Sequence, residues 1–174
     1  MALATIDNRR SRRMHRWTLI AGAALMACVV PVTTAAAARP SDSDLRVARI
    51  DPDAAPPGGT THVRGYVGNT GPERTANKFT MTITLPKDVK PEEPFFPENC
   101  FVLGSGHRVR CTYPPGLGPS RTATADIPVR LDRRVPAPGR LTGGSVSVSS
   151  IDDRNKENNR TPFEIPTDPN AIGS

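Results

Sequence analysis

Two cysteines stand where they could form a covalent cross-link. Cys100 and Cys111 lie in β-type runs on either side of the glycine-containing loop 104–107, and such a loop is typical of a β-hairpin. If Leu103 pairs with Arg108, Cys100 falls directly opposite Cys111, at a separation that a disulfide accepts. The sequence therefore predicts a hairpin disulfide, which contributes about 3 kcal/mol in the chain-entropy model. The alternative is a reactive thiol beside the loop histidine, which requires an unpaired, deprotonated sulfur.

The two histidines beyond residue 38 are not placed as catalytic bases usually are. His62 alternates with apolar residues along a predicted strand and therefore faces solvent, and His107 lies at a loop tip. Nucleophilic catalysis needs an oriented, partly buried histidine. The sequence contains neither a G-x-S-x-G elbow nor a zinc spacing such as C-x₂-C. We therefore expect a protein that is not an enzyme, with no catalytic, cofactor-binding or metal-ligating residue.

A polar segment near the end of the chain carries many side-chain oxygens that could bind calcium: Asp152, Asp153, Asn155, Glu157, Asn158 and Asn159. The segment lacks the alternating spacing and the central glycine of a calcium loop. Asp and Asn also stabilise turns by hydrogen bonding to the backbone nearby. We interpret residues 151–159 as a structural turn, an interpretation that calcium-dependent thermal stability would reverse.

Two segments are candidate contact surfaces. One is a proline-bounded patch in which acidic residues precede two aromatic residues, which form either a binding surface or a plug at the end of the fold. The other is the predicted hairpin, where two arginines share the outward face. The candidate contact residues are Glu92, Glu93, Phe95, Phe96, His107, Arg108 and Arg110. The candidate loops are 87–99, 104–107 and 151–159.

Residues 1–38 contain the three parts of a secretory signal peptide: a basic block, an apolar run and a small-residue stretch. The apolar run is short for a membrane span and contains Pro31. We expect cleavage after Ala37 or Ala38 and a secreted or envelope-associated protein without a transmembrane anchor. The export route, general secretory or twin-arginine, stays open. Cys28 is a candidate for lipidation, although the chain stays apolar after it.

Length, composition and charge exclude several classes of protein. The 174 residues fit one domain, and 19 Pro with 14 Gly exclude a helical bundle. The formal net charge is +6, but residues 1–38 hold five Arg and one Asp, so the rest of the chain carries only +2. Nucleic-acid binding needs a stronger basic footprint with stacking aromatic residues. We therefore expect no nucleic-acid partner.

Short strands must hold all of these residues in place. Apolar and polar residues alternate in short runs, most clearly over residues 79–85, and Pro/Gly turns separate the runs. Seven or eight strands without a helical period predict an antiparallel β-sandwich. We expect a flexible leader at 39–44, one domain at 45–166 and a C-terminal tail at 167–174. Pro128 indicates an edge strand or a bulge, and Gly143 with Gly144 indicates a bulge.

Several turn and strand motifs occur in a familiar order: Asn69-x-Gly71-Pro72, Leu85-Pro86, Cys100 with Val109-x-Cys111, Gly118-Pro119-x-Arg121-Thr122-Ala123, and Asp152-Asp153 followed by Asn158-Asn159. Over residues 45–166 the chain resembles the immunoglobulin-like domain of bacterial secreted and cell-wall proteins. That family is catalogued as a domain of unknown function and is similar to the bacterial cell-adhesion-related domain. The resemblance implies an immunoglobulin-like sandwich outside the cytoplasm, and none of its motifs is catalytic.

The leading hypothesis is a non-catalytic, secreted, immunoglobulin-like domain, expected to be monomeric, that binds an unidentified protein or cell-envelope component. Its rigid sandwich would present loops for contact. One alternative is a small secreted enzyme inhibitor that inserts a proline-rich loop, and protection of a secreted hydrolase would identify it. The other is a carbohydrate-binding module, which pull-down on insoluble glycans would identify. An aromatic content of 5% argues against the module.

Overall fold

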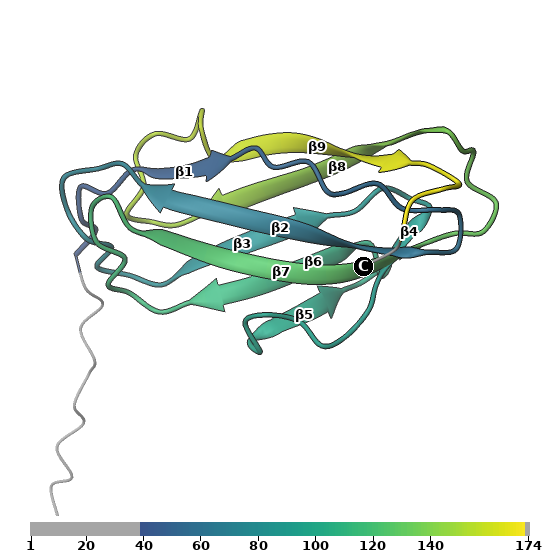
Figure 1. The fold of residues 1–174 in the computed structure, drawn as a ribbon. Helices are drawn as coiled ribbons and strands as arrows, with labels where there is room; N and C mark the ends of the chain where they lie inside the picture. Colours follow the sequence, from purple (N-terminus) through teal and green to yellow (C-terminus); the bar gives the residue numbers. More distant parts are fainter. Residues whose placement is uncertain (1–38, 173–174) are drawn as a thin grey trace, which may run out of the picture. The chain divides into compact units, whose positions relative to one another are not determined.

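The computed structural model describes residues 39–172, so the predicted signal peptide and Cys28 lie outside the described residues. In the described part nine strands form two antiparallel sheets and no helix occurs. The four-stranded sheet has the order β1-β2-β7-β4, and the five-stranded sheet has the order β5-β6-β3-β8-β9 (Figure 1). The strands are β1 Leu45–Ala48, β2 Thr60–Asn69, β3 Phe79–Thr84, β4 Val89–Pro91, β5 Cys100–Leu103, β6 Arg108–Tyr113, β7 Thr122–Leu131, β8 Gly139–Ser149 and β9 Arg160–Thr167.

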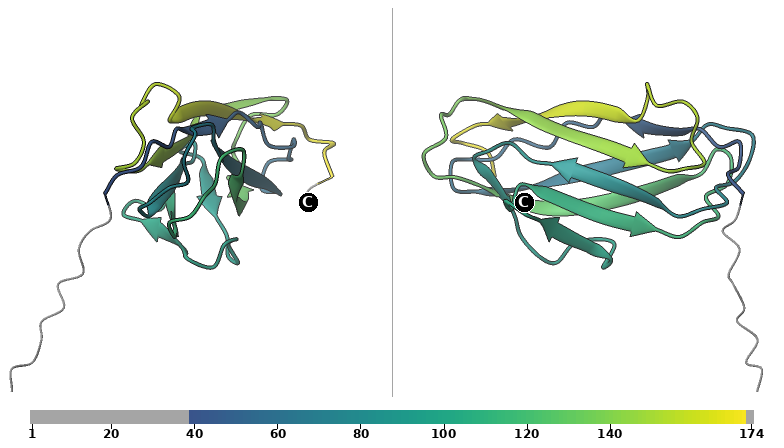
Figure 2. Two further views of the ribbon diagram at one scale, coloured as in Figure 1. Left: turned by 90° about the vertical axis from the view of Figure 1, so that its left-hand side faces the viewer. Right: turned by 180° about the vertical axis from the view of Figure 1, so that it is seen from behind.

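Alternation along the strands creates the core between the two sheets. In β3, Phe79, Met81 and Ile83 are buried while the threonines between them are partly exposed. The two sheets face each other as separate layers (Figure 2). At Gly65 a Cβ atom would lie 2.4 Å from the Met81 Sδ, so glycine allows the sheets to approach there. Tyr113 stacks on Phe79 with ring centroids 4.9 Å apart.

The predicted sandwich is confirmed, with one strand more than expected. The additional element is β4, a three-residue strand at the edge of its sheet. Its Pro91 falls at the last position, where a proline costs no interior ladder hydrogen bond. The bulge in β8 is also present, because the register with β9 shifts between Leu141 and Gly144, and Gly143 has a φ of 92°.

The expectation for Pro128 is wrong. Its strand, β7, is not an edge strand, because β7 pairs with β2 on one side and with β4 on the other. Proline is tolerated there because β4 ends at Pro91, so the missing N–H falls just beyond the end of a short ladder. The Pro128 carbonyl still accepts a hydrogen bond from the Glu92 backbone N–H at 2.8 Å.

The segment before β1 differs from the flexible leader expected at 39–44. Ser41 and Ser43 are buried, with 8% and 2% of their surface exposed. The Ser41 backbone N–H donates to the Asp152 carboxylate at 3.1 Å, and Ser43 forms a parallel bridge with Asp153. Burial and these two contacts with the 150–153 turn show that this segment packs on the sandwich. At the other end, β9 continues one residue past the expected boundary, to Thr167.

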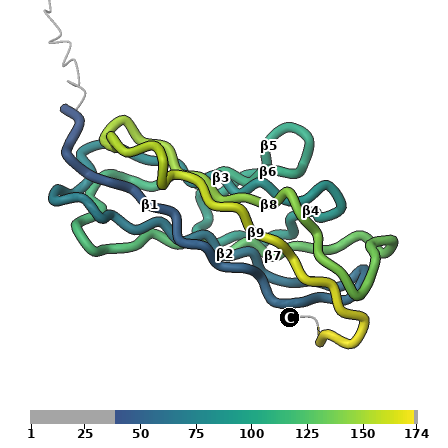
Figure 3. The backbone as a smooth tube through the Cα atoms, turned by 90° about the horizontal axis from the view of Figure 1, so that it is seen from above, coloured from purple at the N-terminus to yellow at the C-terminus, as the bar shows by residue number. Residues whose placement is uncertain are grey.

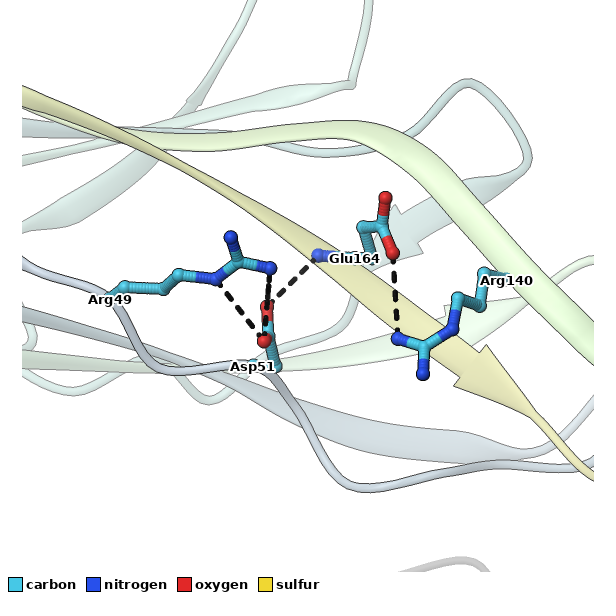
Figure 4. Close-up of polar contacts among 4 residues, drawn as sticks. All are labelled: Arg49, Asp51, Arg140 and Glu164. Carbon is cyan, nitrogen blue, oxygen red and sulfur yellow. Dashed lines mark hydrogen bonds and ion pairs between the residues drawn. The ribbon is translucent and has the colours of Figure 1, made fainter.

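One long edge of the sandwich is closed by hydrogen bonds between the sheets. The chain from β1 to residue 55 runs alongside β9 (Figure 3). The Val47 N–H donates to the Asn158 carbonyl and the Ala55 N–H donates to the Pro166 carbonyl, both at 3.1 Å. Asp51 contributes further, because its carboxylate accepts hydrogen bonds from the Arg49 side chain and from the Glu164 backbone (Figure 4). Burial raises the pKa of Asp51, but these hydrogen bonds outweigh it and the pKa lies below its usual value.

The opposite long edge is built differently. There β4 ends one sheet and β5 ends the other, and residues 92–99 cross between them. The contact residues predicted from sequence gather around this second edge.

No described helix is long and apolar enough to cross a membrane.

Candidate interaction site

The β5–β6 hairpin has the predicted register. Leu103 pairs with Arg108, and Cys100 pairs with Cys111, to which it is joined by a disulfide. The two Cα atoms are 4.0 Å apart. Cys111 is fully buried and Val109 beside it on the same face is also buried, so the disulfide fastens β5 to a strand that is part of the core.

Two apolar side chains on β5 are exposed although they belong to a strand. Phe101 is 48% exposed and Val102 is 40% exposed. Because β5 is an edge strand, each of them has a cross-strand neighbour on one side only. Sequence reasoning missed both residues. The signal available was the run Phe101–Val102–Leu103, in which apolar residues do not alternate with polar ones.

Phe101 belongs to a row of side chains that crosses the outer surface of the five-stranded sheet. The row follows the strand register and contains Phe101, Arg110, Thr82, Ser147 and Arg160. With Arg108, which is two positions from Arg110 on the same strand, these residues define what we call the hairpin face. As predicted, Arg108 and Arg110 are both exposed on one side of β6 while Val109 between them is buried.

The hairpin face is cationic. Arg108 and Arg110 have no ion-pair partner among residues 39–172, and Arg160 donates to the Ser145 hydroxyl at 3.1 Å rather than to a carboxylate. The side chains between these arginines, Thr82 and Ser147, carry hydroxyl groups. A guanidinium without an internal partner is available to a ligand with acceptor groups.

The proline-bounded patch lies at the same edge of the sandwich as the hairpin, but beside β7 of the four-stranded sheet. Phe95 is buried and contributes to the core, so it acts as the plug that was one of the two interpretations of this patch. Phe96, in contrast, is 59% exposed. Backbone hydrogen bonds in both directions pair Phe96 with Asp126 of β7, at 3.0 and 2.8 Å. Asp126 in turn binds His62, 2.7 Å away. Phe96 therefore lies beside β7 in the four-stranded sheet, and the structure does not bring it onto the hairpin face.

Glu92 and Glu93 are also separated from the hairpin face. Glu92 forms an ion pair with Arg130 of β7, and this hydrogen-bonded pairing raises the pKa of the guanidinium. Glu93 is exposed. These residues adjoin a groove of about 510 Å³ along β4 and β7, which is lined by side chains of both charges, among them Lys90 and Asp132.

His107 has a structural role that its place in a loop did not predict. Its Nδ1 lies 3.2 Å from the Val89 carbonyl oxygen, and its own carbonyl accepts a hydrogen bond from Leu85. The hairpin loop is therefore tied to β4 and to the end of β3. Between β4 and the hairpin runs a second groove of about 350 Å³, lined by Lys90, Pro91, Val102 and the loop residues including His107.

The remaining histidine, His62, pairs with Asp126 and not with the acidic turn. His62 and Asp126 are each about one third exposed on the outer surface of the four-stranded sheet, in agreement with the predicted solvent-facing position. Within residues 39–172 no group of three or more His, Cys, Asp and Glu side chains is placed to hold a metal ion. Asp152 is buried and accepts hydrogen bonds from the Ser41 and Asn77 backbones and from the Asn77 side chain.

Comparison with known proteins identifies the fold. No family model and no curated protein sequence matches the chain. Among solved structures, the third cohesin ScaC of Acetivibrio cellulolyticus, determined in complex with the ScaB dockerin, is similar with a TM-score of 0.51 and 11% identity. The match covers 71% of this chain and 99% of the cohesin.

Two further structures are similar at lower scores. A CARDB domain from Pyrococcus furiosus has a TM-score of 0.45 and 14% identity, over 73% of this chain and 94% of that one. The collagen-binding domain of a Staphylococcus aureus adhesin has a TM-score of 0.46 and 9% identity, over 75% and 99%. The two antiparallel sheets and the similarity to the cohesin show that the chain has an immunoglobulin-like β-sandwich fold. At these identities the likeness concerns the fold alone.

Proposed function

We propose that this protein is a non-catalytic interaction domain, which binds a protein partner through the hairpin face. The observation that carries the proposal is the exposed pair of Phe101 and Arg110, directly opposite each other on a disulfide-linked hairpin. Aromatic residues and arginine are enriched in protein interfaces, and arginine is also enriched among the few residues that carry most of the binding energy. Phe101 exposes apolar surface beside Arg110 and Val102, and exposed apolar surface rimmed by polar residues is a mark of protein interaction sites.

The free edge of β5 supports the same proposal. A Cα separation of 4.0 Å is typical of a pair that exchanges no backbone hydrogen bonds, so the Cys100 N–H points away from β6 and donates to the Pro97 carbonyl. Val102 lies two residues later on the same strand, so its backbone groups have the same orientation as those of Cys100. Its backbone N–H and carbonyl are therefore directed outward, where an extended segment of a partner could pair with β5.

The disulfide favours binding by holding these groups in place. A partner that meets a rigid strand loses less conformational entropy than one that must order a flexible loop. The cross-link joins β5 to Cys111 in the core, and His107 ties the hairpin loop to β4. A disulfide also fits a protein that acts outside the cytoplasm, so we propose an extracellular or envelope location.

The two alternative functions have less support. An inhibitor that inserts its proline-rich loop needs a projecting loop, whereas residues 95 and 96 are held by burial and by hydrogen bonds to β7. A carbohydrate platform needs aromatic residues side by side. The exposed aromatics Phe96 and Phe101 instead belong to the outer surfaces of different sheets.

A matched pair of variants tests the proposal. Phe101→Asp places a charge on the hairpin face, and Phe96→Asp makes the same change over the other sheet. Each immobilised protein is exposed to secreted and envelope proteins of its own organism, and the affinity of any captured protein is then measured. We expect Phe101→Asp and Arg110→Glu to weaken binding at least about tenfold, as hot-spot changes do, and Phe96→Asp to leave it unchanged.

Circular dichroism and thiol titration check that the variants keep the fold and the disulfide. A captured partner that binds Phe101→Asp and Arg110→Glu as tightly as the unaltered protein would contradict the hairpin face as the binding site. Loss of binding in Phe96→Asp alone would move the site to the four-stranded sheet.

A further inference from the structure

Buried oxygen atoms without partners gather where the chain enters the sandwich. Within residues 39–172, five buried side-chain atoms have no hydrogen-bond partner, and every one of them is an oxygen of this region. They are Ser41 Oγ, Ser43 Oγ, Asp153 Oδ2, Asn158 Oδ1 and Asn159 Oδ1. We call these five residues the junction cluster. Buried polar groups in proteins are nearly always paired, so five unpaired oxygens in one region mark a candidate ligand site.

Three segments bring the junction cluster together. Ser43 forms a parallel β-bridge with Asp153, which places these two side chains next to each other. Asn158 donates its side-chain N–H to the Asp44 carboxylate at 2.9 Å, and its carbonyl accepts from Val47. Residues 41–44, 150–153 and 158–159 therefore lie next to one another, although residue 41 and residue 152 are 111 positions apart in the sequence.

The unpaired oxygen atoms need either hydrogen-bond donors or a cation. The carboxylate oxygen of Asp153 and the amide oxygen of Asn158 can only accept, and the bond to Asp44 fixes which end of the Asn158 amide is the oxygen. Asp153 is 3% exposed and forms no ion pair among the described residues. Its other carboxylate oxygen accepts one hydrogen bond, from the Asn155 N–H at 3.1 Å. A buried carboxylate with so little compensation is unfavourable.

The two basic side chains of the same turn, Arg154 and Lys156, have other partners than the junction cluster. Arg154 pairs with Asp42 at 3.7 Å, and the Lys156 ammonium donates to the Ser150 carbonyl at 2.9 Å. Asp152, which is fully buried beside Asp153, adds a second negative charge, and this charge is stabilised only by amide donors. Water molecules would satisfy the lone pairs of the cluster but would leave the charge of Asp153 uncompensated.

We propose that the junction cluster binds one Ca²⁺ ion. Asp153 would supply the charged ligand, Asn158 and Asn159 amide oxygens, and Ser41 and Ser43 hydroxyl oxygens. Calcium accepts six to eight such oxygen ligands in irregular geometry, with waters or carbonyls completing the shell, whereas Mg²⁺ requires a near-octahedral set. The ligands come from two distant parts of the chain, which explains why the sequence of residues 151–159 shows no calcium-loop spacing.

Thermal unfolding of the purified, chelator-treated protein tests the site. Extracellular calcium modules have dissociation constants of about 10⁻⁴–10⁻³ M, so about 5 mM CaCl₂ is the probe. We expect Ca²⁺ to raise the Tm by about 4 °C or more, because a ligand that binds only the folded state stabilises it. The same concentration of Mg²⁺ should give less than half of that shift.

Two carboxylates provide a matched comparison. Asp153→Asn removes the charged ligand, while Asp168→Asn alters an exposed aspartate that makes the same local bond, from a backbone N–H two residues later. We expect the calcium shift to disappear in Asp153→Asn and to persist in Asp168→Asn. The proposal would be overturned if Ca²⁺ did not change the Tm of the unaltered protein. It would also be overturned if Ca²⁺ raised the Tm of Asp153→Asn as much as that of the unaltered protein.

A second variant covers the case in which Asp153→Asn does not fold. Asn159→Asp adds a carboxylate at another ligand position, so it should enlarge the calcium shift and tighten Ca²⁺ binding measured by calorimetry. An unchanged or smaller response in Asn159→Asp would also overturn the proposal.

Discussion

Asn77 binds the Asp152 carboxylate with both its backbone and its side chain. The backbone N–H donates to Oδ2 at 2.7 Å and the side-chain N–H donates to Oδ1 at 2.8 Å, across 75 positions of sequence. Burial alone would raise the pKa of Asp152, but the hydrogen bonds from Asn77 and Ser41 outweigh it and the pKa is lowered. This contact fastens the start of β3 and the segment before β1 to the turn after β8.

Asp152→Asn should therefore destabilise the protein at neutral pH by about 2–3 kcal/mol, since it removes a charge-assisted set of hydrogen bonds. The folded pKa lies below the unfolded value of about 3.9, so this stabilisation is complete above that value and is lost as the pH falls through the folded pKa. Urea unfolding at neutral and acidic pH measures the difference. A difference between variant and unaltered protein that does not shrink in acid would contradict this account, and Asp168→Asn is the control.

Removal of the disulfide should lower the free energy of unfolding by about 3 kcal/mol. The variant Cys100→Ser/Cys111→Ser, in a chain without residues 1–38, leaves the hairpin register intact but frees β5 from the core. Urea unfolding with and without reductant measures the effect, and the double variant should be insensitive to reductant. Titration of the folded chain without residues 1–38, and so without Cys28, should detect no thiol before reduction, and two reactive thiols would refute the cross-link.

Gly144→Ala should destabilise the sandwich by about 1–3 kcal/mol, as overpacking does. A Cβ at this position would lie 2.5 Å from a ring carbon of Phe163, which is buried and cannot move aside. Gly68→Ala is the matched control, because the nearest atom to its Cβ would be 3.9 Å away. Equal losses of stability in the two variants, measured by urea unfolding, would show that the close approach to Phe163 is unimportant.

Tyr113 should ionise only at a pH above that of a free tyrosine. Its hydroxyl donates to the Thr124 carbonyl at 2.7 Å, and burial raises its pKa. In a Tyr66→Phe protein, absorbance titration reports this one phenol beyond residue 38. Because the folded pKa is raised, stability is unaffected below about pH 10 and falls as the pH rises further. Reversible ionisation near pH 10 without unfolding would contradict the buried position.

Local pattern was sufficient to predict much of this fold. The alternation of β3, the bulge at Gly143 and the opposition of Cys100 to Cys111 all follow from the two-residue period of strands and from loop length, which act between near neighbours. The same reasoning failed at Pro128, because whether β7 is an edge strand depends on the short β4, which the sequence hardly marks. The expectation of a flexible leader at 39–44 was wrong for a similar reason, since the hydrogen-bond partner of that segment is the distant 150–153 turn.

The candidate site depended on tertiary structure to a greater extent. From the sequence alone, Phe96 and Arg110 were equal candidates, but the order of strands places them on the outer surfaces of different sheets. Phe101 is exposed only because β5 has no neighbour on one side. The junction cluster likewise exists only in the fold, which joins serines near the start of the chain to Asp153 and Asn159 near its end. Sequence thus determined which residues form strands and which cysteines meet, because both depend on residues that are close together in the chain. Packing decided which side chains are exposed or unpaired, because burial depends on residues far away in the chain.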